Sequence, residues 1–148
     1  MRSSICLDSN LIIKLVLVQT DSALAETLWE RIIRNQWQPV APPLFSYEVV
    51  SVFRRYVHQG IISHALGNRL LQKLRGFEVQ EHSFVGIHQR AFDLAQQFNR
   101  PTAYDSHYLA LAEHLDCEFW TADKKLFNAS HESFPFIHKL DEVVDDLK

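Results

Sequence analysis

Four carboxylates stand where a predicted strand ends or a predicted helix begins: Asp8, Glu48, Asp105 and Asp123. In a parallel sheet, strand ends and the helix starts that follow them lie along one edge, where ligands bind. Hard carboxylate oxygens suit Mg²⁺ or Mn²⁺, and a water bound to such a metal becomes a nucleophile near neutral pH. The four acids therefore predict a divalent-metal site suited to phosphodiester chemistry.

Each acid also has a local structural role that its position would explain. Asp8 and Asp123 can cap the helices that follow them, because an aspartate side chain accepts a hydrogen bond from a free backbone N–H at a helix start. Glu48 and Asp105 fall in the predicted first turns of helices, where a negative charge is favourable. Position alone leaves both roles open for every acid.

Short apolar runs alternate with stretches of helical periodicity, which indicates an α/β domain with a mainly parallel sheet. Caps are expected from Ser9 or Asn10, from Asp21 or Ser22, and from Ser46, Ser63 and Ser83, with Gly60 and Gly76 as stops. The predicted strands cover residues 5–7, 38–41, 77–81, 118–120 and 136–140, and the predicted helices cover 11–17, 22–35, 47–59, 63–74, 85–98, a segment carrying Asp105, 124–128 and a last turn at 141–147.

Length and composition predict one domain over residues 1–148. A hydrophobic fraction of 47% with only 4 glycines argues against disorder and low complexity. The net charge of −3 means that any affinity for nucleic acid must come from local basic patches. Trp37 and Phe45 lie near predicted loops and are expected to be the most exposed of the large aromatic residues.

Cys6 and Cys117 lie in apolar runs and are expected to be buried, reduced thiols, which favours a cytoplasmic location. Asp8, Asn10 and Lys14 interrupt the apolar N-terminal stretch, so a signal peptide is not predicted. No uninterrupted apolar run approaches the ~18 residues that would cross a bilayer, and no membrane association is expected.

Four segments together resemble the PIN domain family, in layout closest to toxins of the VapC type. The match extends over essentially the whole chain, and its third and fourth segments are the most specific. The segments are Leu7-Asp8-Ser9-Asn10, Ser46-Tyr47-Glu48-Val49 with Arg54-Arg55 downstream, Tyr104-Asp105-Ser106-His107-Tyr108-Leu109-Ala110-Leu111-Ala112, and Thr121-Ala122-Asp123-Lys124-Lys125-Leu126.

The resemblance implies a three-layer α/β/α sandwich and a metal-dependent ribonuclease. Asp8, Glu48, Asp105 and Asp123 would be the metal-binding acids, with Mg²⁺ or Mn²⁺ as cofactor. Metal-activated water would attack an RNA phosphodiester and leave a 5′-phosphate and a 3′-hydroxyl. The resemblance also implies supporting roles in orienting the acids or a water for Ser9, Asn10 and Thr121, whose alternative role is local capping.

The same resemblance implies a homodimer and an antitoxin that lies along a groove between early helices, here 22–35 and 47–74. Three alternatives stay open: a PIN nuclease that works without an antitoxin, a non-catalytic RNA- or protein-binding module, and a phosphatase-like use of Asp8 as nucleophile. The last is disfavoured because Asn10 stands where that motif has a second Asp. Basic residues that could hold phosphates, or could equally be solvated, are Lys14, Arg54, Arg55, Lys124 and Lys125.

Overall fold

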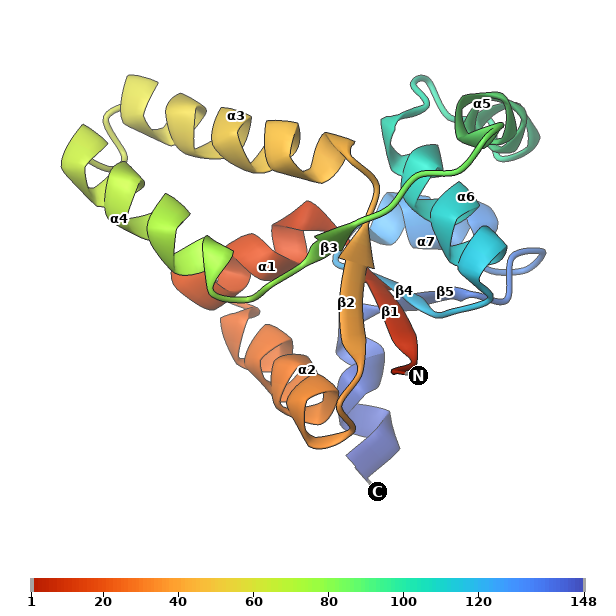
Figure 1. Cartoon of the computed structure of the whole chain (residues 1–148), viewed down its shortest axis with the longest axis horizontal. Coiled ribbons are helices and arrows are strands. Elements are labelled where there is room, and N and C mark those ends of the chain that lie inside the picture. The colour runs from red at the N-terminus through yellow and green to blue at the C-terminus, as the bar shows by residue number, and fades with distance from the viewer. Residues whose placement is uncertain (1, 148) are drawn as a thin grey trace.

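The computed structural model describes residues 2–147 and contains one five-stranded sheet in which every pairing is parallel (Figure 1). The strand order is β3-β2-β1-β4-β5. Such an order requires a crossover between successive strands, and helices supply it. The strands are β1 (Ser4–Leu7), β2 (Gln38–Ala41), β3 (Gln80–Glu81), β4 (Phe119–Thr121) and β5 (Ile137–Lys139).

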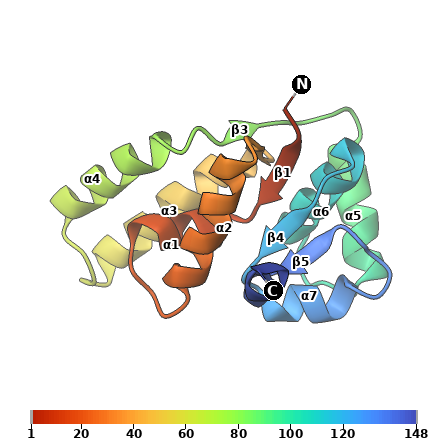
Figure 2. The same cartoon turned by 90° about the horizontal axis from the view of Figure 1, so that it is seen from below.

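Helices cover both faces of this sheet, so the predicted α/β/α sandwich is confirmed. Helices α1 to α4 lie on one side and α5 to α7 on the other, while η1 returns the C-terminal segment to α2 (Figure 2). The helices are α1 (Ser9–Val16), α2 (Ser22–Arg34), α3 (Leu44–His58), α4 (His64–Arg75), α5 (Ile87–Gln97), α6 (Tyr104–Leu115), α7 (Lys124–Ser130) and the 3₁₀ helix η1 (Leu140–Leu147).

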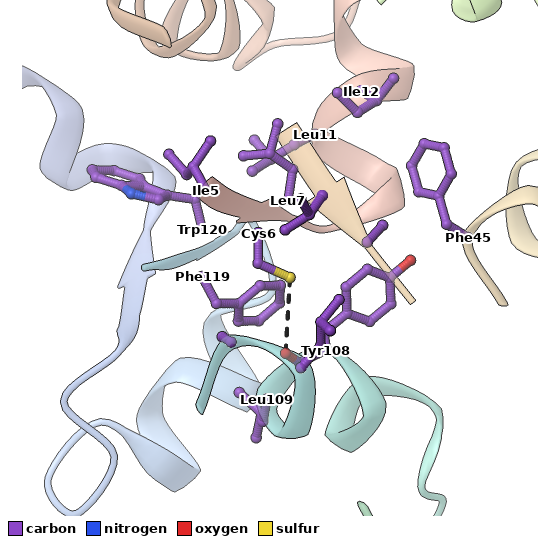
Figure 3. Packing of buried hydrophobic residues seen from close by; sticks show 14 of the residues in the cluster. Ile5, Cys6, Leu7, Leu11, Ile12, Phe45, Tyr108, Leu109, Phe119 and Trp120 are labelled. Atoms are coloured by element: carbon purple, nitrogen blue, oxygen red, sulfur yellow. Dashed lines mark hydrogen bonds between the residues drawn. The ribbon is translucent and has the colours of Figure 1, made fainter. Parts of the chain in front are cut away.

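The centre of the fold is the pair β1–β4 packed against α6. Cys6, Phe119 and Leu109 have no exposed surface, and the Cys6 thiol lies 3.8 Å from the backbone oxygen of Tyr108 (Figure 3). Strands buried on both faces read as continuous apolar runs, which is why the sequence pattern identified them. A packed core therefore holds rigid the strand ends from which candidate site residues project.

Two helix starts differ from the prediction, and a third follows one of the alternatives left open. Asp8, expected to be either a cap or a metal ligand, caps α1 by accepting from the backbone N–H of Asn10, so Ser9 and Asn10 do not supply the cap. Helix α3 begins at Leu44, ahead of the predicted Ser46 cap, so Glu48 lies in its second turn. Helix α5 begins at Ile87 after Gly86, whose φ of 95° suits only glycine without strain, so Ser83 caps nothing.

The remaining differences concern burial and length. Phe45, expected to be exposed, is buried, and Ile33 on α2 is 61% exposed. Trp37 is half-buried rather than exposed. The predicted strand 77–81 pairs only at Gln80–Glu81.

Both cysteines are buried free thiols, as predicted. Burial raises the pKa of Cys6 well above its ordinary value and that of Cys117 to about 11, so both stay protonated and unreactive at neutral pH. Within residues 2–147, no helix combines the length and the apolar character needed to cross a membrane.

Candidate active site

The four predicted acids lie on four different elements at the carboxyl edge of the sheet. Asp8 follows β1, Asp123 follows β4, Glu48 projects from α3 after β2, and Asp105 lies in the first turn of α6. Strands β1 and β4 are neighbours, with Leu7 aligned to Trp120. The parallel topology thus brings residues more than one hundred positions apart to one edge, as predicted from strand ends alone.

Thr121 links two of the acids directly. Its Oγ1 donates to Asp8 Oδ2 at 2.8 Å and accepts from the backbone N–H of Asp123 at 3.0 Å. Thr121 is completely buried and Asp8 is 5% exposed, so this contact is shielded from water. A buried hydroxyl that bridges two strand ends fixes one carboxylate against the backbone of the other.

Glu48 is held by a residue that the sequence reasoning did not select. The hydroxyl of Tyr108, on α6, donates to Glu48 Oε1 at 2.7 Å. Tyr108 is 1% exposed. Its side chain points from α6 toward the sheet (Figure 3). This hydrogen bond joins α3 on one side of the sheet to α6 on the other.

Burial and repulsion from neighbouring acids raise the pKa values of Asp8, Glu48 and Asp105. Burial, opposed by the hydrogen bond from Thr121, raises the pKa of Asp8. Burial, with added repulsion from Asp8 and Asp105, raises the pKa of Glu48 to about 7. Burial, with repulsion from Asp8 and Asp123, raises the pKa of Asp105 to about 6. The charges of Asp8, Asp105 and Asp123 therefore act on neighbouring carboxyl groups, as members of one negative cluster do.

Arg100 is the cation that acts on this cluster. Its positive charge lowers the pKa of Asp105, against the larger effect of burial. The Nε atom of Arg100 and the Oγ atom of Ser106 are buried without a hydrogen-bond partner in the described part of the chain. Ser106 directly follows Asp105, and Arg100 precedes it by five residues, so both unpartnered atoms belong to the segment that carries this carboxylate.

The donor set fits a hard divalent cation. Four carboxylates repel one another and a bound cation would offset that repulsion. The described side chains, those of residues 2–144, do not, however, already place three His, Cys, Asp or Glu groups around one point. Mg²⁺ retains several water ligands and needs few direct carboxylates. An open arrangement of acids therefore suits Mg²⁺ better than a closed cage of protein ligands would.

The structural roles foreseen for the aspartates are also present. Asp8 caps α1 and Asp123 caps α7, the latter by accepting from the N–H of Leu126 at 3.1 Å. Ser9 makes a long contact of 3.4 Å to Asp8, and only the backbone of Asn10 reaches it. Capping and a place in the acid cluster therefore coexist in both residues.

The predicted phosphate-binding residues divide into two groups. Lys14 pairs with Asp21 at 3.0 Å and bonds Gln19, so its charge is already engaged. Arg54, Arg55, Lys124 and Lys125 are exposed. Lys124 and Lys125 follow Asp123 at the start of α7, beside the acids.

Sequence reasoning missed Tyr108 and Arg100. Tyr108 lies three residues after Asp105, a spacing that places both on one helix face, but the spacing does not show that Tyr108 reaches Glu48 on α3. Arg100 stands in the segment between α5 and α6, and no pattern in the sequence gave it a role. His107 is half-buried and bonds His88 at 2.9 Å, so it belongs to an α5–α6 contact.

The chain is similar to known proteins by family model, by sequence and by fold. The family model described as PIN domain matches residues 5–132. VapC ribonuclease Mb0985 of Mycobacterium bovis is 33% identical over 94 residues, which cover 64% of this chain and 72% of that protein. Ribonuclease VapC3 of Pyrobaculum aerophilum is 30% identical over 94 residues, covering 62% and 68%. A toxin–antitoxin complex from Klebsiella pneumoniae shares the fold, with a TM-score of 0.64 at 20% identity over 91% of this chain and 96% of that one.

Proposed function

The chain belongs to the PIN domain family, and from that premise we propose that it is a metal-dependent endoribonuclease, the toxin of a toxin–antitoxin pair. The relatives named as VapC ribonucleases support the activity, and the fold shared with a toxin–antitoxin complex is compatible with it. The observation that carries the proposal is the cluster of Asp8, Glu48, Asp105 and Asp123 at one sheet edge, where the charges of neighbouring acids help to raise the pKa values of Asp8, Glu48 and Asp105.

In this proposal the four acids hold Mg²⁺ or Mn²⁺. A divalent metal held there would supply Lewis-acid chemistry, activating a water and offsetting charge on the scissile phosphate. Thr121 orients Asp8 through its 2.8 Å hydrogen bond, and Tyr108 orients Glu48 through its 2.7 Å bond. Arg100 stands beside Asp105 as a cation available to a phosphate oxygen.

The first test is cleavage of a mixed RNA pool by the purified, partner-free protein with Mg²⁺, with Mn²⁺ and with EDTA. Asp8→Asn and Asp105→Asn proteins run in parallel with Glu132→Gln, which alters an exposed acid away from the cluster. We expect metal-dependent cleavage by wild type and by Glu132→Gln, and a loss of at least about 100-fold in both Asn variants.

Two other results would change the conclusion. A folded wild-type protein that leaves every RNA intact would favour a non-catalytic binding module. Cleavage that survives both Asn substitutions would mean that the acid cluster is not the active site. Circular dichroism of each variant separates these results from a failure to fold.

An antitoxin is the partner that the proposal requires, and a groove between α3 and α4 offers a place for it. This groove holds about 400 Å³ and includes the apolar side chains of Phe45, Val49, Val50, Leu71 and Leu74. The residues that line it come from α3, α4 and the segment after α4, so α2, expected to share it, does not contribute. Val50 is 53% exposed on its rim. An amphipathic segment would bury this surface.

The discriminating experiment for the partner is genetic and biochemical. Co-expression of a small protein encoded beside this chain should suppress its ribonuclease activity and co-purify with it. Val50→Glu, which places a charge in the groove, should weaken that association without altering cleavage. Full activity in the presence of every neighbouring gene product would favour an RNA-processing nuclease with no antitoxin. We also propose a cytoplasmic location. We propose a homodimer as well, and size-exclusion chromatography with light scattering tests it by measuring the molar mass.

A further inference from the structure

The positive charge of this chain is concentrated in one hairpin. Between Glu48 and Glu78 the sequence contains five Lys or Arg residues and no acid. The total charge of −3 is thus the sum of +5 in this stretch and −8 in the rest of the chain. The stretch forms most of α3 and all of α4, a hairpin that extends away from the sheet and is called the arm below (residues 44–75) (Figure 1). Its cations are Arg54, Arg55, Arg69, Lys73 and Arg75.

These cations are free to bind a ligand. All five are exposed, and none forms a salt bridge with an acid among the side chains described, those of residues 2–144. Arg69 and Lys73 are four residues apart on α4 and share one face. Leu70 and Leu74, each one residue further along and so about 100° around the helix, are buried. The charge is therefore directed to solvent and is not used to hold the arm to the body.

The basic surface continues from the candidate active site. Glu48 and Arg55 are seven residues apart on α3, a spacing that places them on the same side of the helix. Arg55 consequently lies about 10 Å along the helix axis from Glu48. A chain that leaves the acid cluster along this side of α3 meets Arg55 first and then the rest of the arm.

A polyanion needs such a surface here. Clustered carboxylates repel phosphates, and the body of the protein carries a large negative charge. At physiological salt, charges farther apart than about 8 Å are largely screened, so only a local cluster of cations can attract a phosphate backbone. Each phosphate neutralised by Lys or Arg also releases a counterion, which favours binding.

We propose that the solvent-facing side of the arm binds the phosphate backbone of RNA beyond the scissile bond, so that long RNAs are preferred over short oligonucleotides. This inference rests on the ribonuclease activity proposed above. It assigns the arm two different ligands. The apolar side chains of the groove between α3 and α4 face a protein segment, and Arg54, Arg55, Arg69 and Lys73 face RNA, while Arg75 lines the groove itself. Binding through phosphates carries little sequence information, so the arm positions RNA while contacts near the acids select the cleavage point.

The test compares two variants with equal loss of charge. Arg69→Gln/Lys73→Gln removes two cations from the arm and keeps good helix formers. Ala23→Glu/Arg34→Gln removes the same net charge from α2, at two exposed positions off the arm. Substrates are a long unstructured RNA, a stem-loop RNA and a short oligonucleotide that spans a cleavage point mapped with wild type. Steady-state cleavage gives KM and kcat, and anisotropy in EDTA gives affinity as a function of salt.

We expect the arm variant to raise KM for long RNA about tenfold with little change in kcat, and to reduce the salt dependence of binding by about one to two phosphate contacts. The α2 control should stay within a factor of two of wild type. Arg69→Lys/Lys73→Arg should restore affinity, because it preserves the charge. Loss for both long RNAs would indicate a general backbone site, and loss for the stem-loop alone would indicate a site for folded RNA.

Other outcomes would overturn the inference. Equal KM values for the arm variant and the α2 control would show that total charge, not the arm, sets affinity. Unchanged RNA affinity with weakened association of a partner protein would make the arm a protein-docking surface. If wild type cleaves RNA but binds long and short RNA equally, the proposed RNA site on the arm is rejected and the proposed ribonuclease activity stands. If wild type neither binds nor cleaves RNA, both proposals are rejected.

Discussion

The hydroxyl of Tyr108 donates to Glu48 from a buried position, and this single atom sets where one of the four carboxylates points. Tyr108→Phe removes the hydroxyl and keeps the ring in the core. We expect a loss of unfolding free energy of about 1–2 kcal/mol, because a hydrogen bond to an ionised acceptor is lost. We expect cleavage to fall several-fold, with a higher Mg²⁺ concentration at half-maximal rate, because Glu48 is no longer fixed.

Tyr56→Phe is the matched control for this prediction. Tyr56 is half-buried on α3, packs against the core and has the Arg55 guanidinium over its ring, and its hydroxyl has no carboxylate partner among the described residues. This variant should change neither stability nor metal requirement. Chemical denaturation and a Mg²⁺ titration of activity measure both effects. Equal behaviour of the two Phe variants would mean that Tyr108 contributes packing alone.

The raised pKa values of Glu48 and Asp105 predict how stability depends on pH in the absence of metal. Burial chiefly raises these pKa values, to about 7 for Glu48 and about 6 for Asp105, from ordinary values of 4.5 and 3.8. The folded state thus holds these protons more tightly than the unfolded chain does. The stability that they contribute is complete below pH ~4 and is lost as pH rises through about 6 and 7.

Asp105→Asn isolates one part of that dependence. Near pH 8 the variant should be more stable than metal-free wild type by about 1–2 kcal/mol, a figure reduced to allow for partial solvent screening. Near pH 4 the two proteins should be about equally stable, because the wild-type carboxyl is then protonated in the folded state. Urea unfolding in EDTA at both pH values measures this difference. A destabilised variant near pH 8 would show that Asp105 is held by a favourable partner.

At the scale of elements, Asp123 has two separable roles. It caps α7 by accepting from Leu126 N–H, and it belongs to the acid cluster. Asp123→Ser keeps a capping oxygen, whereas Asp123→Ala removes it. We expect both to lose cleavage, and the Ala variant alone to lose about 1 kcal/mol of stability. Thermal unfolding and RNA cleavage together separate the roles. Activity retained by the Ser variant would assign Asp123 to capping alone.

Elements were predictable where a short-range signal dominated. Strands β1, β2 and β4 are apolar because both faces are covered, and Ser63 caps α4 as expected from its position. Helix starts were less predictable, because Leu44 to Ser46 extend α3 through tertiary contacts. One such contact is the hydrogen bond that the Ser46 hydroxyl donates to the carboxylate of Glu81, in β3. The start of α5 depends on a left-handed Gly86, which the sequence pattern around Ser83 did not reveal.

The whole molecule determines what sequence could say about the site. Strand ends identify Asp8 and Asp123 because parallel topology alone brings them together. The bond from Tyr108 to Glu48 depends instead on how α3 and α6 lean toward each other across the sheet edge, which no local pattern encodes. The same holds for burial of Arg100 Nε and for the direction in which the arm extends.

Because the acid cluster draws on four elements, its ligand should stabilise the entire fold. A cation that binds the native state and not the unfolded chain adds about 2.7 kcal/mol at 100 times its dissociation constant. For a chain of this size, that corresponds to an increase in Tm of roughly 5–10 °C. Mg²⁺ or Mn²⁺ should therefore raise the Tm of wild type and of Glu132→Gln, and should fail to raise that of Asp8→Asn/Asp105→Asn.

Screening is the effect that this experiment must separate from binding, because salt alone weakens repulsion among carboxylates. NaCl at matched ionic strength supplies the comparison, since it screens without occupying a divalent site. A Tm shift that is specific to the divalent ion and lost in the double variant would mean that two acids act on one ligand. These acids are Asp8, which follows β1, and Asp105, on α6. An equal shift with NaCl would leave the acids as a strained cluster relieved by salt, and the metal site would then be rejected independently of any activity assay.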